Sequence, residues 1–134
     1  MRNRFFSLIV PLVLSCPHKD IPLSVEVAQT LEEKTKGLMF RESLDENTGM
    51  LFIFNKAGKA SMWMKNTLIP LDMIFGDSEG HILAIYENAI PLSLSTIGPV
   101  RHTTYVLEIT GGSVAKQGIS HQCQIYLPKA LAPR

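Results

Sequence analysis

The sequence predicts one α+β domain that consists mostly of β-strands and carries two short helices. The chain has 134 residues, a length that suits a single domain. Most of its apolar segments are short and are bounded by turn residues, and several alternate with polar residues as half-buried strands do. Two other segments, 31–36 and 113–117, carry the start or stop signals of helices.

The composition excludes two classes of protein. Hydrophobic residues make up 46% of the chain, which is too high for a disordered protein. The 13 Lys and Arg residues nearly balance the 12 Asp and Glu residues, so the chain lacks the basic excess with which nucleic-acid-binding proteins contact phosphates. We therefore expect no nucleic-acid partner. Composition alone indicates neither a ligand nor a reaction.

Residues 1–15 have the features of a signal peptide. Two arginines precede an uncharged apolar stretch over residues 5–14, and Ser15 and Cys16 supply small residues at a cleavage point. The stretch is too short to span a bilayer, which takes about 20 residues. The alternative is a buried strand or helix at the start of the fold. We favour the signal peptide because basic residues precede the stretch.

The four residues Val13-Leu14-Ser15-Cys16 resemble the lipobox of bacterial lipoproteins. In such a signal the peptide is cleaved before the cysteine, and the cysteine carries a diacylglycerol. The resemblance implies that Cys16 attaches a lipid and anchors the protein to a membrane, in the periplasm or on the outer face of the cell envelope. Residues 16–22 are then a tether, which reaches only about 20 Å when extended.

The two cysteines leave a second possibility open. An exported protein with two cysteines commonly forms one disulfide, here between Cys16 and Cys123. If Cys16 carries a lipid instead, Cys123 stays as a small buried thiol, because it alternates with Ile125 and Leu127 on one face of a predicted strand.

The first elements after the tether are a strand and a helix. Residues 23–28 alternate apolar and polar side chains, as a half-buried strand does. Thr30 and Glu33 have the spacing of a capping box, and Gly37 is a stop signal, so we expect a helix over 31–36.

The other elements follow from apolar patterning and from glycine or proline at the turns. In order they are a buried strand over 50–54, a turn at 56–59, a strand over 60–65, a strand over 71–75 after Pro70, a turn at 76–80, a strand over 81–86, a loop over 91–104, a strand over 105–110, a helix over 113–117 before Gly118, and a strand over 122–127. The loop is long for a compact domain, and such loops are often functional. The predicted domain covers 23–128, and 129–134 is a tail.

Six short motifs occur in a fixed order along the chain. They are Val25-Glu26-Val27-Ala28, Gly37-Leu38-Met39-Phe40-Arg41, Gly49-Met50-Leu51-Phe52-Ile53-Phe54, Trp63-Met64-Lys65-Asn66-Thr67, Pro70-Leu71-Asp72-Met73-Ile74-Phe75 and Tyr105-Val106-Leu107-Glu108. In order and spacing they are similar to the motifs of the domain of unknown function 192 family, over about residues 23–127. The resemblance implies a compact, mostly antiparallel, barrel-like α+β domain that is often exported. It implies no established activity.

Three acidic residues, Glu26, Asp72 and Glu108, stand in the middle of predicted strands among apolar neighbours. A buried carboxylate is costly unless it is paired, so we expect one of them to contact Arg41 or Lys65. We favour a structural polar network that ties the strands together. The alternative is a pair of carboxylates that act as acid and base in an envelope hydrolase.

Trp63 is the only tryptophan in the chain, and it shares a predicted strand face with Lys65. An aromatic side chain among polar ones can bind a sugar or a protein partner, and it can equally close one end of a barrel. This strand end is our first choice for a binding site. The full set of candidate binding residues is Arg41, Trp63, Lys65, Asn66, Asp72 and Glu108.

The run Met62-Trp63-Met64 suggests a further alternative. Thioethers select Cu(I), and an aromatic face can cover a cation. Methionine also fills irregular gaps in cores, and no histidine stands at ligand spacing in this run. We therefore expect neither a metal nor another cofactor as part of the leading hypothesis.

The leading hypothesis is a non-catalytic binding or accessory domain of the cell envelope. Its partner would be a small ligand, a glycan or a protein, in addition to the membrane reached through Cys16. Catalysis by Glu26, Asp72 or Glu108, and copper handling by the methionines around Trp63, are the alternatives. The oligomeric state and the choice of inner or outer membrane stay open.

Overall fold

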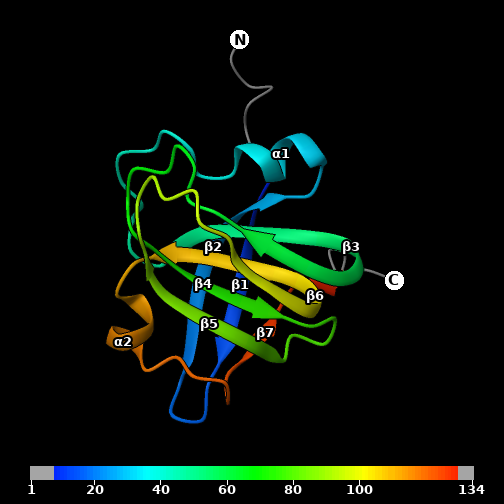
Figure 1. The fold of residues 1–134 in the computed structure, drawn as a ribbon. Coiled ribbons are helices and arrows are strands. Elements are labelled where there is room, and N and C mark those ends of the chain that lie inside the picture. The colour runs from blue at the N-terminus through cyan, green and yellow to red at the C-terminus, as the bar shows by residue number, and fades with distance from the viewer. Residues whose placement is uncertain (1–7, 130–134) are drawn as a thin grey trace.

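The structure is a computed structural model, and it describes residues 8–129 (Figure 1). Along the chain these residues form β1 (Ile9–Ser15), β2 (Asp20–Ala28), α1 (Leu31–Lys36), β3 (Thr48–Met62), β4 (Leu71–Gly76), β5 (Ile82–Ala89), β6 (Ile97–Thr110), α2 (Ser113–Gln117) and β7 (Gln124–Tyr126). The predicted fold class is confirmed: a mostly antiparallel sheet curls into a half-barrel and carries two short helices. No helix among the described residues is long and apolar enough to cross a membrane.

The strands form one sheet in the order β5-β4-β6-β3-β2-β1-β7. Neighbouring strands are antiparallel except β2 and β3, which run parallel and are joined by a crossover that contains α1. The two ends of the sheet approach each other at the turn before β5, where the Ile125 amide donates to the Gly80 carbonyl at 2.8 Å. Gly80 has φ +85°, and a Cβ there would lie 2.0 Å from the Ile125 carbonyl oxygen, so this closure requires glycine.

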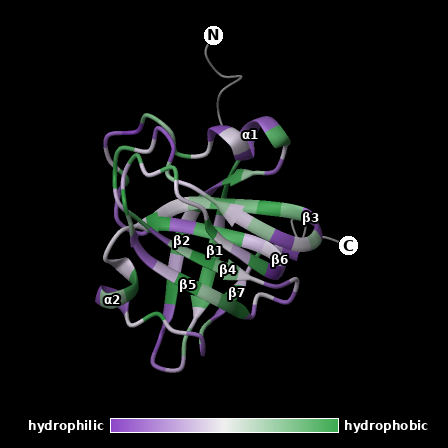
Figure 2. Ribbon diagram, viewed as in Figure 1, coloured by the Kyte–Doolittle hydropathy of each residue, from purple (hydrophilic) through white to green (hydrophobic). Residues whose placement is uncertain are grey.

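The central strands bury both faces. One face points into the curl of the sheet, where β1, β2 and β7 complete a core with side chains such as Leu12, Val25 and Leu107. The other face carries a second apolar cluster that includes Met50, Phe52 and Met73. Figure 1 shows α1 and the neighbouring loops gathered at one end of the molecule. In Figure 2 the central strands are largely hydrophobic and the connections more mixed.

Both predicted helices are confirmed with their boundaries. In α1 the Glu33 amide donates to the Thr30 hydroxyl at 3.1 Å, and the Glu33 carboxylate accepts from the Thr30 amide at 3.0 Å, which completes the capping box. Gly118 ends α2 in the left-handed conformation, φ 71° and ψ 36°.

Two predictions within the domain are wrong in part. The turn expected at 56–59 is absent, because β3 continues from Thr48 to Met62 as one strand. The loop expected over 91–104 ends at residue 96, because β6 begins at Ile97. These outer halves of β3 and β6 pair with each other through register shifts that follow Ile53, Gly58 and Ala60. Bulges of this kind interrupt the alternation of apolar and polar residues by which a strand is recognised in a sequence.

In the structure, much of the segment predicted as a signal peptide is part of the sheet, and the signal peptide itself stays a prediction. Residues 9–15 form β1, which pairs with β2 on one side and β7 on the other. Leu12 and Leu14 lie in the core, so the structure agrees with the alternative of a buried N-terminal strand. The predicted tether over 16–22 is also part of the fold, because β2 starts at Asp20. Residues 1–7 and 130–134, which include most of the predicted tail, lie outside the described residues.

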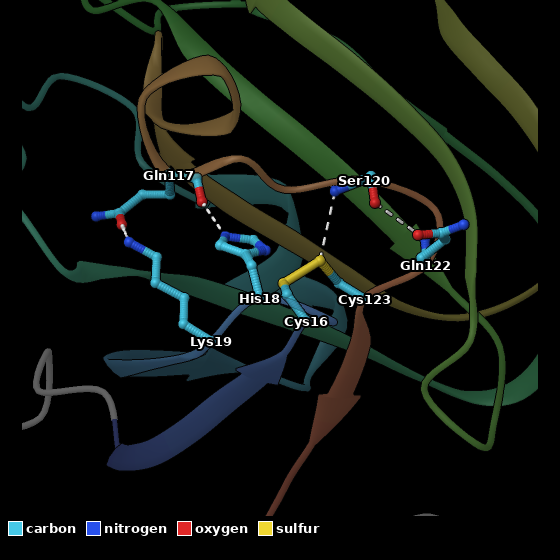
Figure 3. The surroundings of a disulfide bond; sticks show 7 residues. All are labelled: Cys16, His18, Lys19, Gln117, Ser120, Gln122 and Cys123. Atoms are coloured by element: carbon cyan, nitrogen blue, oxygen red, sulfur yellow. Dashed lines mark hydrogen bonds between the residues drawn. A yellow bond between two sulfur atoms is a disulfide. The ribbon is translucent and has the colours of Figure 1, made fainter.

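Cys16 and Cys123 form a disulfide in the structure (Figure 3). Nearby, the carbonyl of Gln117 lies 2.9 Å from the His18 ring nitrogen Nε2, and the Lys19 ammonium donates to the Gln117 side chain at 2.9 Å. The disulfide agrees with the second of the two possibilities for the cysteines. Neither cysteine is a free thiol in this structure. A sulfur in a disulfide cannot at the same time carry a thioether-linked lipid, so lipid attachment at Cys16 stays a prediction for a form that lacks this bond.

Candidate functional site

The candidate site is a cleft on the second face of the sheet, which we call the Glu108 cleft. It lies between α1, the turn that follows it and the end of β3, and it has about 280 Å³ of empty space, part of it open to solvent. Its charged and hydroxyl-bearing side chains are Lys34, Thr35, Lys36, Lys65, Thr67 and Glu108. Its apolar side chains are Leu38, Met39, Phe52, Met62 and Trp63.

Glu108 lies at the bottom of this cleft. It is near the end of β6, and its register partners are Met50 of β3 and Met73 of β4. Its side chain shares a face with Val106, which belongs to the second apolar cluster. The residue is only 3% exposed. The sheet therefore places this carboxyl among apolar side chains rather than in water.

No hydrogen bond or ion pair holds the Glu108 carboxyl within residues 8–129. Burial raises the pKa of Glu108 to about 8, because the charged form loses its hydration without gaining a partner. The carboxyl is therefore mostly protonated at neutral pH and can donate a hydrogen bond. Buried polar groups are normally hydrogen-bonded, so an unpartnered one that lines a cleft marks a candidate binding site.

Three lysines line the cleft around this neutral acid. The Lys34 ammonium donates to the Ile53 carbonyl at 3.2 Å and lies 4.4 Å from the centre of the Phe54 ring. The Lys65 ammonium lies 5.1 Å from the centre of the exposed Trp63 ring. Lys36, at the end of α1, is exposed. At neutral pH the lining is therefore positively charged.

Backbone hydrogen bonds tie three loops together at this end of the molecule. The Phe40 amide donates to the Asn66 carbonyl at 2.8 Å. The Met64 amide donates to the Ser93 carbonyl, and the Leu92 amide to the Thr67 carbonyl, both at 3.0 Å. These bonds join the turn after α1, the segment after β3 and the segment before β6. The walls of the cleft thus come from segments that are fixed to one another.

The same three loops carry exposed apolar side chains. Phe40 is 66% exposed and Leu92 is 58% exposed, and both have φ of 67°. Bulky residues rarely adopt positive φ, and such strain is concentrated at functional sites. We call the exposed apolar side chains of these loops the apolar rim. The apolar rim consists of Phe40, Leu68, Ile90, Leu92 and Leu94.

Asp72 lies away from the cleft and has a structural role. It is fully buried on the opposite face of β4 from Met73. Its carboxylate accepts from the amides of Asn88 at 2.8 Å, Gly112 at 3.2 Å and Val114 at 2.8 Å. It thereby fixes the end of β5 and the start of α2 to the sheet. These bonds satisfy the carboxylate without a ligand.

The expected contact between an acidic strand residue and Arg41 is confirmed at Glu26. The guanidinium donates two hydrogen bonds to the Glu26 carboxylate, from Nη1 to Oε2 and from Nη2 to Oε1, the second at 2.8 Å. Their hydrogen bond raises the pKa of Arg41. The pair lines a different groove, next to Ile9 and Ser24. Arg41 therefore ties the turn after α1 to β2.

The structure brings three of the six predicted binding residues together: Trp63, Lys65 and Glu108. Asn66 borders this group, because its side-chain amide donates to the Met39 sulfur at 3.8 Å. Arg41 and Asp72 lie elsewhere. The sequence prediction missed Lys34 and Lys36 as members of the site. No local signal identifies them, since their place depends on how the crossover sets α1 against the sheet.

The structure separates the three acidic residues proposed for catalysis. Glu26 and Glu108 are both register neighbours of Met50, so their backbones are two strands apart, about 10 Å. Asp72 faces the other side of the sheet. Within the described chain, no group of three or more His, Cys, Asp or Glu side chains is placed to hold a metal ion.

Residues 14–127 match the model of the DUF192 family, described as "Uncharacterized ACR". The chain is similar to a "putative transcription regulator" from Sinorhizobium meliloti 1021 whose crystal structure is known. The two sequences are 35% identical, and the structures superpose with a TM-score of 0.88 over 91% of this chain and 95% of that one. A crystal structure of a protein of unknown function from Novosphingobium aromaticivorans DSM 12444 is 37% identical, with a TM-score of 0.82 over 88% of this chain and 84% of that one. A search of curated proteins found no match.

Proposed function

Because the chain belongs to the DUF192 family, whose description names no activity, we propose that it is a non-catalytic binding domain that takes a small ligand in the Glu108 cleft. The observation that carries this proposal is the buried carboxyl of Glu108, which lines an open cleft and has no partner among residues 8–129. An unsatisfied buried carboxyl lowers the stability of a fold. A ligand that accepts its hydrogen bond would remove this cost.

The same geometry argues against a hydrolase. General acid and base catalysis of glycoside cleavage needs two carboxyl groups that face one bound substrate, about 5–9.5 Å apart. Glu108 is the single acidic residue of the cleft lining. Glu26 is paired with Arg41 in another groove, and three backbone amides hold Asp72 on the far face of the sheet. Catalysis therefore stays the less favoured reading.

Copper handling is also less favoured. Met39 and Met62 line the cleft, and Met64 is buried in the second apolar cluster. Lys34, Lys36 and Lys65 line the same cleft. Their charges oppose the entry of a metal cation.

We propose an oxidising compartment such as the periplasm as the place where the protein works. The disulfide between Cys16 and Cys123 supports this location, because such bonds persist mainly outside the reducing cytosol. Attachment of a lipid to Cys16 competes with the disulfide, so an anchored form would have to lack that bond. Regulation of transcription, which the description of the Sinorhizobium protein suggests, gains no support from a formal net charge of +1.

Chemical-shift mapping tests the proposed binding site. Isotope-labelled protein is titrated with sodium acetate, indole, N-acetylglucosamine and imidazole, and the backbone amides are followed. At least one probe should shift amides over 36–39, 62–67 and 108 together. The variant Lys65→Gln should reduce these shifts, whereas Lys56→Gln, at an exposed lysine outside the cleft, should not. Shifts confined to the groove of Glu26 and Arg41, or no shifts with any probe, would contradict the proposal.

A further inference from the structure

Two features of the Glu108 cleft restrict what can occupy it: the charge of its lining and its size. Three lysines and one neutral acid line it, so an anionic group is attracted and a cation repelled. The cavity proper has a volume of only about 30 Å³, far below the range of about 300–1,000 Å³ that is typical of pockets for drug-sized ligands. The cleft therefore has room for a small terminal group rather than for a whole large ligand.

The apolar rim gives the rest of such a ligand a place to lie. Phe40 and Leu68 directly follow the cleft residues Met39 and Thr67 in sequence, and Leu92 is hydrogen-bonded to Thr67. Ile90 and Leu94, on the same loop as Leu92, are 71% and 66% exposed. Apolar side chains that cluster on rigid, strained loops mark a binding surface more strongly than scattered ones do. The positively charged cleft and the apolar rim are thus linked through Met39 and Thr67.

We propose that the ligand is an amphiphilic monocarboxylate, with its carboxylate in the Glu108 cleft and its alkyl chain on the apolar rim. This inference rests on the proposed binding function of the cleft. The ligand's carboxylate accepts a hydrogen bond from the protonated Glu108 carboxyl and lies near the Lys65 ammonium. Its chain covers apolar surface on Leu92 and its neighbours. No covalent step is involved.

The charged groups around Glu108 give this binding a defined pH dependence. Lys34 and Lys36 face the cleft from α1, and Lys65 faces it from the segment after β3. The neighbouring strands contribute Met50 and Met73, which do not titrate. Loss of the Glu108 proton removes the hydrogen-bond donor and adds a negative charge beside the ligand. Affinity for a carboxylate should therefore fall as the pH rises through about 8.

Trp63 is the single tryptophan of the chain and part of the cleft lining, so its fluorescence reports binding directly. The intact, disulfide-bonded protein is titrated at pH 7 with sodium octanoate, and in parallel with octanol, octylammonium chloride and sodium butanoate. Octanoate should bind most tightly. Butanoate should bind about tenfold or more weakly, because its chain buries less apolar surface. Octanol should bind less tightly than octanoate, and octylammonium should be the weakest of the eight-carbon probes.

Variants separate the two halves of the surface. Lys65→Gln should weaken octanoate binding about tenfold, the typical value of one charge-assisted hydrogen bond. Leu92→Ser should weaken the binding of octanoate but leave the binding of butanoate nearly unchanged. Glu108→Gln should abolish the decline of octanoate affinity between pH 7 and 9, because the amide does not titrate. The matched surface controls Lys56→Gln and Ile9→Ser, both outside the cleft and the rim, should bind as the parent protein does.

The outcomes distinguish this inference from the binding function on which it rests. Equal binding of octanoate, octanol and octylammonium, or insensitivity to both Lys65→Gln and Leu92→Ser, would overturn the monocarboxylate assignment. If acetate, indole, N-acetylglucosamine or imidazole shifted the cleft amides in that case, the binding site itself would stand. Failure of every probe to act at the cleft would overturn both.

Discussion

Glu108 of β6 lies directly opposite Met73 of β4, and within residues 8–129 no group donates a hydrogen bond to its carboxyl or forms an ion pair with it. An apolar side chain in place of Glu108 would pack more favourably against its two register neighbours, Met50 and Met73. The fold instead carries a neutral acid at the bottom of a cleft lined by three lysines. This combination is the basis of the proposed binding function.

The first prediction concerns stability and pH. The folded protein holds the pKa of Glu108 at about 8, above its ordinary value of 4.5 in the unfolded chain. The folded state therefore binds the proton more tightly between these values, and the free energy of unfolding falls as the pH rises through this window. The slope due to this group is at most about 1.4 kcal/mol per pH unit, and it levels off above about pH 8.

Urea denaturation of the parent protein and of Glu108→Gln between pH 5 and 9 measures this effect. The difference in unfolding free energy should grow in favour of the variant up to about pH 8. Glu87→Gln, at an exposed position of β5, is the matched control and should leave the pH profile unchanged. Parallel profiles for the parent and Glu108→Gln would show that the carboxyl is not held in its protonated form.

The second prediction concerns the disulfide. Cys16 and Cys123 are 107 residues apart in sequence, so their bond restricts most of the unfolded chain. Its reduction should lower the free energy of unfolding by about 3–5 kcal/mol. Urea denaturation with and without dithiothreitol measures this, and Cys16→Ser/Cys123→Ser should be insensitive to the reductant. An intact mass that includes a diacylglycerol, or two free thiols in protein purified without reductant, would contradict the bond.

The third prediction concerns Asp72. Its carboxylate accepts three backbone hydrogen bonds in the interior. Asp72→Asn replaces one accepting oxygen by an amino group that faces backbone donors, so it should lower the free energy of unfolding by about 2–4 kcal/mol. Asp20→Asn, at an exposed position, should have little effect on stability. Near-parent stability of Asp72→Asn would show that these bonds do not hold α2.

The fourth prediction concerns Arg41, which belonged to the predicted binding set but lies outside the Glu108 cleft. Arg41→Lys removes the two-pronged contact with Glu26 and should lower stability by about 1 kcal/mol, because the pair is partly exposed. Octanoate affinity should stay within twofold of the parent value. A large loss of affinity at unchanged stability would place the ligand in the groove of Glu26 and Arg41 instead.

The parts of the fold that could be predicted from the sequence are those fixed by local chemistry. The capping box of Thr30 and Glu33 defines α1 without reference to the rest of the chain. The sequence alone does not distinguish the strand β1 from the apolar part of a signal peptide, because a strand buried between two others has the same composition. The distinction depends on pairing with β2 and β7, which is not local.

The same limit applies to the site. Glu26, Asp72 and Glu108 look alike in sequence, since each is an acid in the middle of an apolar strand. The register of the sheet places Asp72 on one face and the two glutamates on the other, and only Glu108 lies without a partner among the described residues. Trp63 and Lys65 were predicted correctly as neighbours because they are two residues apart, although β3 ends at Met62 and the predicted strand over 60–65 does not extend through them.

The most direct test of the central claim is the ¹³C chemical shift of the Glu108 side-chain carboxyl, followed by NMR with and without sodium octanoate. Without the ligand the carboxyl should titrate near pH 8. With octanoate at pH 7 its signal should shift, and its titration should move to higher pH, because the bound carboxylate stabilises the protonated acid. A carboxyl signal that octanoate leaves unchanged, while the ligand binds elsewhere on the protein, would contradict the account.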